Sequence, residues 1–448
     1  MEIFRREKRF PQPSLTVMTD STRFPANDSP PSLFSRWSRA VAAWLNPRRL
    51  LIQAIILTCC LWGVCAVDFS TPGLMDRAGN IKFQDFLQFY ISARLIAQGR
   101  TSQLFDQQIA STELQTIVQQ PTRVRLPTVY GPQVGLVFVP LARFPFLIAA
   151  TVWVAISVLV FFSCLHWLWK FCPNLRPYPG IVAMSAICFP PFFHFFVRGQ
   201  ISVLVLACFA AAFLAFRSSN DWLAGAALGL LAFKPQFLVA IPLVLLLAFA
   251  WKALAGLVAS VFAQLTLTWM YFGTAVIRAY FDTLWHIPRW IGIAEPGVAQ
   301  AQMHSLRSFW VLLLPWPTVA MVFYLLASTV VLIIAAASWR TRGDLAVRFS
   351  ALMFAAVLIN PHLFVYDLLV LAPALLLLAD WALGHANHPA FAPLSVLIYL
   401  AFILPLLGPL TVWTHFQLSV PVFVGIQVLL WSILRGKMQD AAFAPYSA

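Results

Sequence analysis

Apolar runs long enough to cross a membrane recur along the chain from residue 50 to residue 434. Hydrophobic residues make up 60% of the 448 residues and charged residues only 10%, and the mean hydropathy is +0.80. Soluble domains carry about 25% charged residues, so this composition excludes a soluble core with one membrane anchor. The sequence therefore predicts an all-α integral membrane protein that crosses the bilayer many times.

The apolar segments predict a bundle of roughly 10–13 transmembrane helices. Two short segments end at Lys234-Pro235 and at Asn360-Pro361, a pattern typical of helices broken within the membrane. Irregular backbone at that depth is tolerated where it lines a protein cavity or water. The segments lie near residues 50–67, 146–169, 180–196, 201–216, 222–233, 236–250, 253–272, 308–338, 349–359, 364–379, 394–412 and 416–434.

The distribution of basic residues predicts how the chain is oriented. Residues 1–49 are expected to be a basic cytoplasmic tail in which 33–45 forms a helix in the membrane interface. Residues 50–434 form the membrane domain, and 435–448 form a second cytoplasmic tail. This orientation places 18 of the 30 basic residues on the cytoplasmic side, nine of them in 1–49 and nine in later segments. The polar stretches 68–128 and 273–307 are then external loops, and the first carries amphipathic helices.

Charge and cysteine content point to no soluble partner. The net charge of +14 is better explained by anionic lipid headgroups than by nucleic acid in a chain this apolar. The seven cysteines lie in or beside apolar runs, where thiols behave as small hydrophobic groups. We therefore expect the lipid bilayer as a partner, no nucleic acid and no disulfide framework.

The first external loop contains an unusual carboxylate. Asp85 stands at the start of an amphipathic helical pattern that should end at Gly99 in a left-handed cap. An alternative is that Asp85 has no role beyond that of a negative charge favoured by the dipole of the helix that it begins. Asp76, between two glycines, is more typical of a turn residue, and Asp106 is typical of a helix N-cap.

The predicted topology gathers polar residues on the external face. Ionisable residues near membrane depth are costly and usually face an interior site, although a single Arg or Lys often reaches the headgroups instead. Cations could hold a lipid-linked phosphate as it leaves, while a carboxylate takes the proton from an attacking hydroxyl. The set comprises Asp68, Asp76, Asp85, Arg198, Gln200, Lys234, Gln236, Asp282, His286, Arg289, Glu295, His304, Arg307, Asn360, His362, Tyr366 and Asp367.

The order of several short motifs resembles a known enzyme family over roughly residues 50–380. It is similar to the polyprenyl-phosphate-sugar-dependent glycosyltransferases of family 87, which include the phosphatidylinositol mannoside mannosyltransferases of mycobacteria. Phe105 stands where the family usually has Tyr, and Tyr366 where His is common. The matching elements are Asp85-Phe-Leu-Gln-Phe-Tyr90, Ala93, Gly99, Leu104-Phe-Asp106, Tyr130-Gly-Pro132, Pro140-Leu141, Trp153, Gly199-Gln200, Gly225, Gly229, Lys234-Pro235, His304-Ser305-Leu306, Pro361-His362 and Tyr366-Asp367.

The resemblance implies a GT-C membrane fold with its active site on the external or periplasmic side of the cell (inner) membrane. It implies a polyprenyl-phosphate-linked sugar donor, with mannose as the expected sugar, and transfer with inversion to a lipid or glycan acceptor. By the same resemblance Asp85 is the catalytic base. Charge and position assign donor phosphate or sugar contacts to Arg198, Lys234, Gln200, His304, His362 and Asn360, with Tyr90, Tyr130, Gln236, Asp367 and Arg307 in support.

The sequence leaves one alternative open for the cofactor and two for the function. The cations supply the charge that a metal would supply, so no cofactor is expected, and the alternative is a divalent ion between Asp85 and Asp76. A multi-pass transporter or flippase would also use broken helices and buried cations. A ligase that moves a whole lipid-linked glycan is the third hypothesis.

Overall fold

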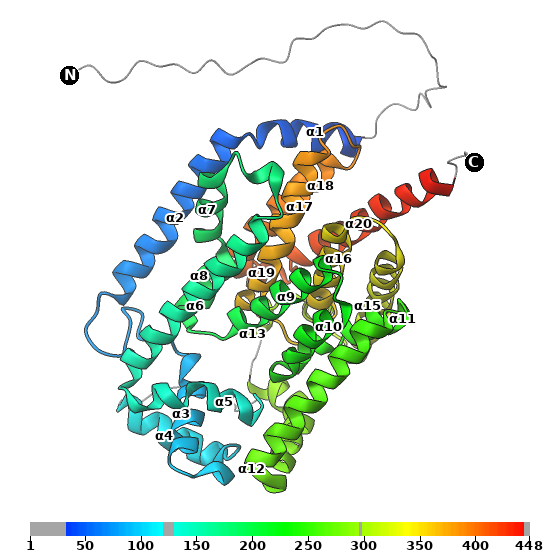
Figure 1. The fold of residues 1–448 in the computed structure, drawn as a ribbon. Helices are drawn as coiled ribbons and strands as arrows, with labels where there is room; N and C mark the ends of the chain where they lie inside the picture. Colours follow the sequence, from blue (N-terminus) through cyan, green and yellow to red (C-terminus); the bar gives the residue numbers. More distant parts are fainter. Residues whose placement is uncertain (1–32, 120–129, 295–297, 443–448) are drawn as a thin grey trace, which may run out of the picture.

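The computed structural model describes residues 33–119, 130–294 and 298–442, and these residues fold almost entirely as helices (Figure 1). Within these ranges the only extended pairing consists of two isolated bridges, Met75 with Ile81 and Met303 with Phe364. The predicted all-α class is confirmed. The α-helices are α1 (Leu33–Trp44), α2 (Pro47–Phe69), α3 (Phe86–Ala97), α4 (Gln107–Val118), α5 (Pro132–Phe138), α6 (Phe146–Trp169), α7 (Pro179–Ile187), α8 (Pro190–Arg198), α9 (Ser202–Arg217), α10 (Asp221–Gly229), α11 (Ile241–Leu247), α12 (Trp251–Ala294), α13 (Val298–Ala301), α14 (Leu306–Leu313), α15 (Pro317–Arg340), α16 (Leu345–Leu358), α17 (Ala372–Gly384), α18 (Phe391–Ile403), α19 (Gly408–Thr414) and α20 (Ser419–Ala442).

Short 3₁₀ segments mark the places where the helical path bends. They are η1 (Thr101–Gln103), η2 (Val139–Arg143), η3 (Pro173–Leu175), η4 (Leu230–Phe233), η5 (Pro235–Leu238), η6 (Val365–Leu371) and η7 (Leu404–Leu407). Proline opens or follows several of them because it cannot continue a helix from within. The helical path is interrupted at Lys234, between η4 and η5, and between α16 and η6, as the sequence predicted; that these breaks lie within the membrane stays a prediction.

Seven helical spans in the described part of the chain are long and apolar enough to cross a membrane, or eight if α7 and α8 count as one span bent by 44°. The expected total of 10–13 therefore included shorter apolar helices such as α9 and α16. The predicted span 308–338 is divided into α14 and α15, because Pro315 and Pro317 interrupt it. The seven are Pro47–Phe69, Phe146–Trp169, Trp251–His286, Pro317–Arg340, Val365–Gly384, Phe391–Thr414 and Ser419–Gly436.

The interior of the bundle is built around α16. Every residue from Phe349 to Leu358 is buried, and α15, α17 and α20 pack around this helix. A helix that is apolar on all sides finds partners on all sides, so its short length does not expose backbone to lipid. α16 is thus an interior element enclosed by longer helices.

The two ends of the molecule differ in character. Figure 1 shows α1 and the C-terminal half of α20 at one end, and α3, α4 and α5 at the opposite end. The predicted helix over 33–45 is found as α1, with Trp37 and Trp44 exposed. Its place in a membrane interface, like the division into tails and membrane domain, stays a prediction.

Candidate functional site

The site is assembled where the C-terminal end of α8 meets the start of α3. α8 ends at Arg198, and Gly199 follows with φ +67°. A Cβ on Gly199 would lie 3.0 Å from Phe86 Cβ, so glycine permits both the left-handed turn and the close approach. The Asp85 backbone N–H then donates to the Arg198 carbonyl at 3.1 Å. Residues more than 100 positions apart are thereby fixed side by side.

The backbone just before Asp85 is strained. Phe83 has φ +55°, a conformation that is costly for an aromatic residue. Its ring is held in place by T-shaped contacts with Phe69 at 5.3 Å and Phe196 at 6.4 Å. Packing therefore maintains a turn that local preference alone would not, and strain of this kind is concentrated at functional sites.

The Asp85 carboxylate is free of the capping role that its position suggested. Asp85 is the N-cap residue of α3, but its side chain accepts no capping hydrogen bond. Instead Oδ2 accepts from Gln200 Nε2 at 2.9 Å, and Oδ1 lies 3.7 Å from Arg198 Nη1. The carboxylate thus faces the α8–α9 junction, and the dipole explanation does not account for its contacts.

Gln200 is held rigidly behind Asp85. It is 1% exposed, its carbonyl accepts from Trp153 Nε1 at 3.2 Å, and its Oε1 accepts from the Ile201 N–H at 3.2 Å. With Oε1 engaged, its amide nitrogen is directed to Asp85. Gln200 is therefore placed to orient the carboxylate, and its expected contact with the donor stays a prediction.

Burial raises the pKa of Asp85 above its ordinary value of 3.8, and Arg198 and Gln200 oppose this shift only in part. Burial, followed by the charges of Asp367 and Asp85, raises the pKa of Tyr130 well above 10, so the phenol stays neutral. A carboxylate with a raised pKa is a better proton acceptor than a fully solvated one. The arrangement suits a base next to a neutral hydroxyl donor.

Lys234 lies at the break between η4 and η5 and is already paired. Its ammonium group forms an ion pair with Asp367 of η6 and lies 3.3 Å from Ser202 Oγ. Ser202 Oγ also donates to Asp367 Oδ1 at 2.6 Å. The Lys234 and Asp367 side chains are 1% and 2% exposed. The rings of Tyr130 and Tyr366 lie 5.9 and 5.7 Å from the ammonium nitrogen.

A second wall is built where residues 302–304 meet residues 363–365. The His304 N–H donates to the Leu363 carbonyl at 2.9 Å, and the Val365 N–H donates to the Gln302 carbonyl at 3.1 Å. Arg307 Nη1 donates to the Pro361 carbonyl at 3.1 Å. These bonds hold the loop after α16 in one conformation.

Three side-chain nitrogens on this wall are buried without a partner: His304 Nε2, Asn360 Nδ2 and His362 Nδ1. The other side of two of these groups is fixed, since His304 Nδ1 lies 2.8 Å from Ser419 Oγ and Asn360 Oδ1 accepts from the His362 backbone N–H at 2.9 Å. Burial lowers the pKa of His304 to about 3, and burial, opposed in part by the charge of Asp367, lowers the pKa of His362 to about 4. Both imidazoles are therefore neutral near pH 7. These nitrogens are free to bind a polar ligand, and other buried polar atoms without a partner lie elsewhere in the bundle, as at Ser157 and Ser328.

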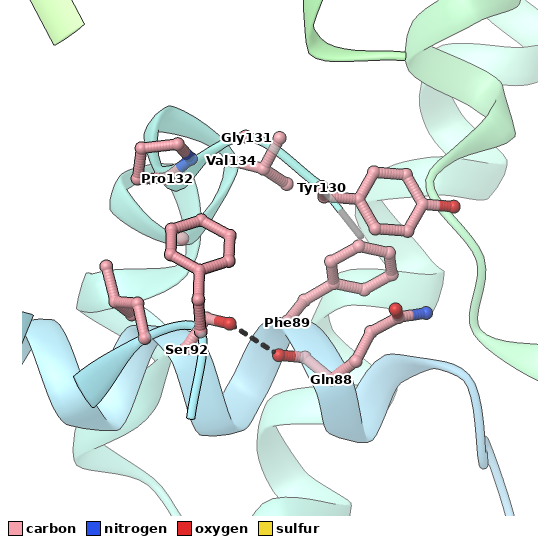
Figure 2. A pocket seen from close by; sticks show the side chains of 10 residues that line it. Gln88, Phe89, Ser92, Tyr130, Gly131, Pro132 and Val134 are labelled. Carbon is pink, nitrogen blue, oxygen red and sulfur yellow. Dashed lines mark hydrogen bonds between the residues drawn. The ribbon is translucent and has the colours of Figure 1, made fainter. Parts of the chain in front are cut away.

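A narrow recess lies beside α3, at Gln88, Phe89 and Ser92. Figure 2 shows Gln88, Phe89 and Tyr130 projecting in the same direction, with Gly131 and Pro132 of the facing segment above them. Gln88 Nε2 donates to the Asp85 carbonyl at 3.2 Å. The volume of the recess is about 10 Å³, close to that of one water molecule. The space beside α3 is thus closed to a sugar ring in this conformation.

Other predicted residues have local structural roles. Tyr90 OH donates to the Phe144 carbonyl at 2.7 Å, and Gln236 lies half-buried in η5. The Asn80 N–H and side chain donate to Asp76, so the turn interpretation is confirmed. Asp106 caps α4 as predicted, and Gly99 has the expected left-handed φ of +73°.

The remaining charged residues of the set do not join this cluster in any contact the structure gives. Asp68 accepts from the Arg77 N–H, and Asp282 lies 3.6 Å from His286 on α12. The Arg289 side chain and Glu295 lie outside the described part. Among the described residues, no group of three or more His, Cys, Asp or Glu side chains could hold a metal ion. All seven cysteines are free.

Sequence reasoning missed Ser202, which joins Asp367 to Lys234. The sequence offered one indication, the position of Ser202 two residues after Gln200 at the start of α9. A small polar residue is common at a helix start, so this position did not point to a role in the site. It also treated Asp367 as a supporting residue, although Asp367 is the partner of Lys234.

Comparison with known proteins identifies the family. No curated protein and no solved structure matches the chain. The model of glycosyltransferase family 87 matches residues 128–365, which is more than half of the 448 residues. Arg198, Lys234, His304 and His362 lie within the matched segment, whereas Asp85 precedes it and Asp367 follows it by two residues. The chain therefore belongs to glycosyltransferase family 87 and is a multi-pass membrane glycosyltransferase.

Proposed function

We propose that the protein transfers a single sugar from a polyprenyl-phosphate donor to a hydroxyl of a lipid or glycan acceptor, with Asp85 as the base. The observation that carries this proposal is the Asp85 carboxylate itself: it serves no cap, is oriented by Gln200, and lies 3.7 Å from the half-exposed Arg198. A base, a cation and neutral donors on one rigid frame are what a displacement at a sugar carbon requires.

The proposed reaction is a single displacement. The Asp85 carboxylate takes the proton from the acceptor hydroxyl as the oxygen attacks the anomeric carbon. The bond from that carbon to the phosphate oxygen breaks, and the lipid phosphate leaves with the electron pair. Attack from the face opposite the leaving group inverts the anomeric centre.

Charge and exposure divide the site between phosphate and sugar. Arg198 has a side chain that is 38% exposed and contacts Asp85 through one nitrogen at 3.7 Å, so the rest of its guanidinium can meet the leaving phosphate. Asn360, His304 and His362 are neutral and have unused nitrogens, which suit sugar hydroxyls better than a phosphate dianion. Arg307 holds this wall through the Pro361 carbonyl. Mannose is the sugar we propose, on the family resemblance alone.

We propose that the site opens on the external face of the inner membrane and that both tails are cytoplasmic. The basic residues at the α1 end and the location of α3–α5 at the opposite end support this orientation (Figure 1). The proposed reaction needs no metal, because Arg198 supplies positive charge at the leaving group.

The test is hexose transfer in proteoliposomes that contain the purified protein, polyprenyl-phosphate mannose and a lipid acceptor extract. Asp85→Asn should reduce transfer by about 10²–10⁴-fold, the usual contribution of a general base. Asp106→Asn is the matched control, because asparagine caps a helix as well as aspartate does. Full activity of Asp85→Asn would remove Asp85 from the mechanism.

The same assay separates the rival hypotheses. Family membership favours group transfer over transport, and the ligase alternative differs in what is transferred. Mass spectrometry of the acceptor should show the addition of one hexose. Addition of a whole glycan would support the ligase, and absence of any covalent product with every donor tested would contradict the proposed function.

A further inference from the structure

The ion pair between Lys234 and Asp367 is the most buried pair of charges among the described residues. The side chains are 1% and 2% exposed, and Ser202 contacts both partners. The pair joins three interrupted helical segments, since Lys234 lies between η4 and η5, Ser202 opens α9 and Asp367 lies in η6. Paired in this way, Lys234 offers no free charge and almost no surface to a phosphate.

The pair is linked to Asp85 by a three-residue segment. Gln200 and Ser202 lie two positions apart, and Gln200 donates to Asp85 while Ser202 donates to Asp367. Both residues are 1% exposed, so neither has freedom to shift independently. A displacement of Ser202 is therefore transmitted to the amide that orients Asp85.

We propose that Lys234 and Asp367 are positioning residues, which hold the Gln200–Ser202 segment behind Asp85 and cancel each other's charge there, so that phosphate recognition falls to Arg198. This inference rests on the proposed function. It reassigns Lys234, which charge alone had placed on the donor phosphate.

The charged and titratable groups that face Asp85 are few. Arg198 ends α8, Tyr130 precedes α5, Lys234 lies at the η4–η5 break, and Tyr366 and Asp367 lie in η6. With Lys234 and Asp367 both present, their charges cancel, and Arg198 is the remaining cation near Asp85 among these groups. Loss of a single partner therefore changes the charge that Asp85 experiences, whereas loss of both does not.

The first test compares single and double variants under saturating and limiting donor. Lys234→Met should reduce kcat by about 10- to 100-fold through misplacement of the base, with little change in donor KM. Lys234→Met/Asp367→Leu should recover much of the lost kcat. Apolar groups can replace both members of a buried ion pair, whereas removal of one member leaves the other as an uncompensated buried charge. Lys170→Met, at an exposed position beyond α6, is the matched control.

Phosphate binding by Lys234 would give the opposite pattern. Donor KM would rise in Lys234→Met, and the double variant would show no recovery. Arg198→Met should behave in that way if Arg198 meets the phosphate, which provides an internal comparison. Either a raised donor KM in Lys234→Met or a double variant as inactive as the single one would overturn the inference.

The second test separates positioning from a role in folding alone. Asp367→Asn preserves the shape of the side chain and leaves Lys234 as an unpaired cation near Asp85. The acid limb of the kcat/KM profile should then move to lower pH, by about one unit. An unchanged acid limb in a correctly inserted variant would contradict the proposal. If wild-type protein transfers sugar and Asp85→Asn does not, the proposed function stands even when the Lys234 and Asp367 variants contradict the positioning role.

Discussion

At the scale of single residues, the site depends on contacts that connect distant parts of the chain. Sequence analysis placed Asp85, Arg198 and His362 on one face because charges at helix ends and breaks are readable from the sequence. The sequence could not show that Lys234 forms an ion pair with Asp367, because the two residues are 133 positions apart and charge alone does not reveal which residues pair. It also could not distinguish a glutamine that contacts a sugar from one that orients a carboxylate.

The pH dependence of transfer follows from the environment of Asp85. Burial raises its pKa above 3.8, so the carboxylate form, and with it the rate, is lost as pH falls through that raised pKa. The Gln200 hydrogen bond favours the carboxylate, so Gln200→Leu should move the acid limb of the kcat/KM profile to higher pH. Profiles of wild type and variant in the same detergent provide the measurement. A limb that moves to lower pH would show that Gln200 does not stabilise the charged form.

At the scale of helices, the close crossing of α10 and α12 fixes the position of α10, which leads through η4 to the helix break at Lys234. A Cβ on Gly225 would lie 1.8 Å from the Ala253 carbonyl oxygen, and one on Gly256 would lie 2.0 Å from the Trp222 carbonyl oxygen. Small residues at such crossings let two backbones touch within a membrane. The sequence showed the glycines and the Lys-Pro stop, but only the structure shows which helix they contact.

This crossing can be tested by adding one methyl group. Gly225→Ala should destabilise the protein by about 1–3 kcal/mol, because the backbone contact leaves no room for the Cβ. Gly63→Ala in α2 is the matched control, since its Cβ meets nothing within 4 Å and alanine favours a helix. Thermal unfolding followed by size-exclusion chromatography in detergent compares the two. Equal melting temperatures for both variants would refute the tight contact.

At the scale of the whole molecule, the fold class and the main helix breaks followed from composition and proline positions. The packing order did not, because apolar periodicity cannot tell an interior helix from a lipid-facing one. α16 illustrates this: the sequence marked it only as a short broken span, yet it is the most enclosed helix of the bundle. Its burial also explains how a short helix can end at Leu358 without exposing its last carbonyls to lipid.

The orientation of the bundle makes a prediction that reaches beyond the site. α4 lies at the end of the molecule opposite α1 (Figure 1). Arg217, at the end of α9, packs on Phe171 just beyond α6, in segments that the basic residues predict to be cytoplasmic. Ser111 on α4 and Ser218 after α9 are both exposed, so each can carry a reactive cysteine with little disturbance. If the site is external, a membrane-impermeant thiol reagent should label Ser111→Cys in intact cells and Ser218→Cys only after permeabilisation. Wild-type protein sets the background from the native cysteines. The reverse pattern would place Asp85 and its neighbours in the cytoplasm, where the donor and the acceptor would both have to be cytoplasmic lipids.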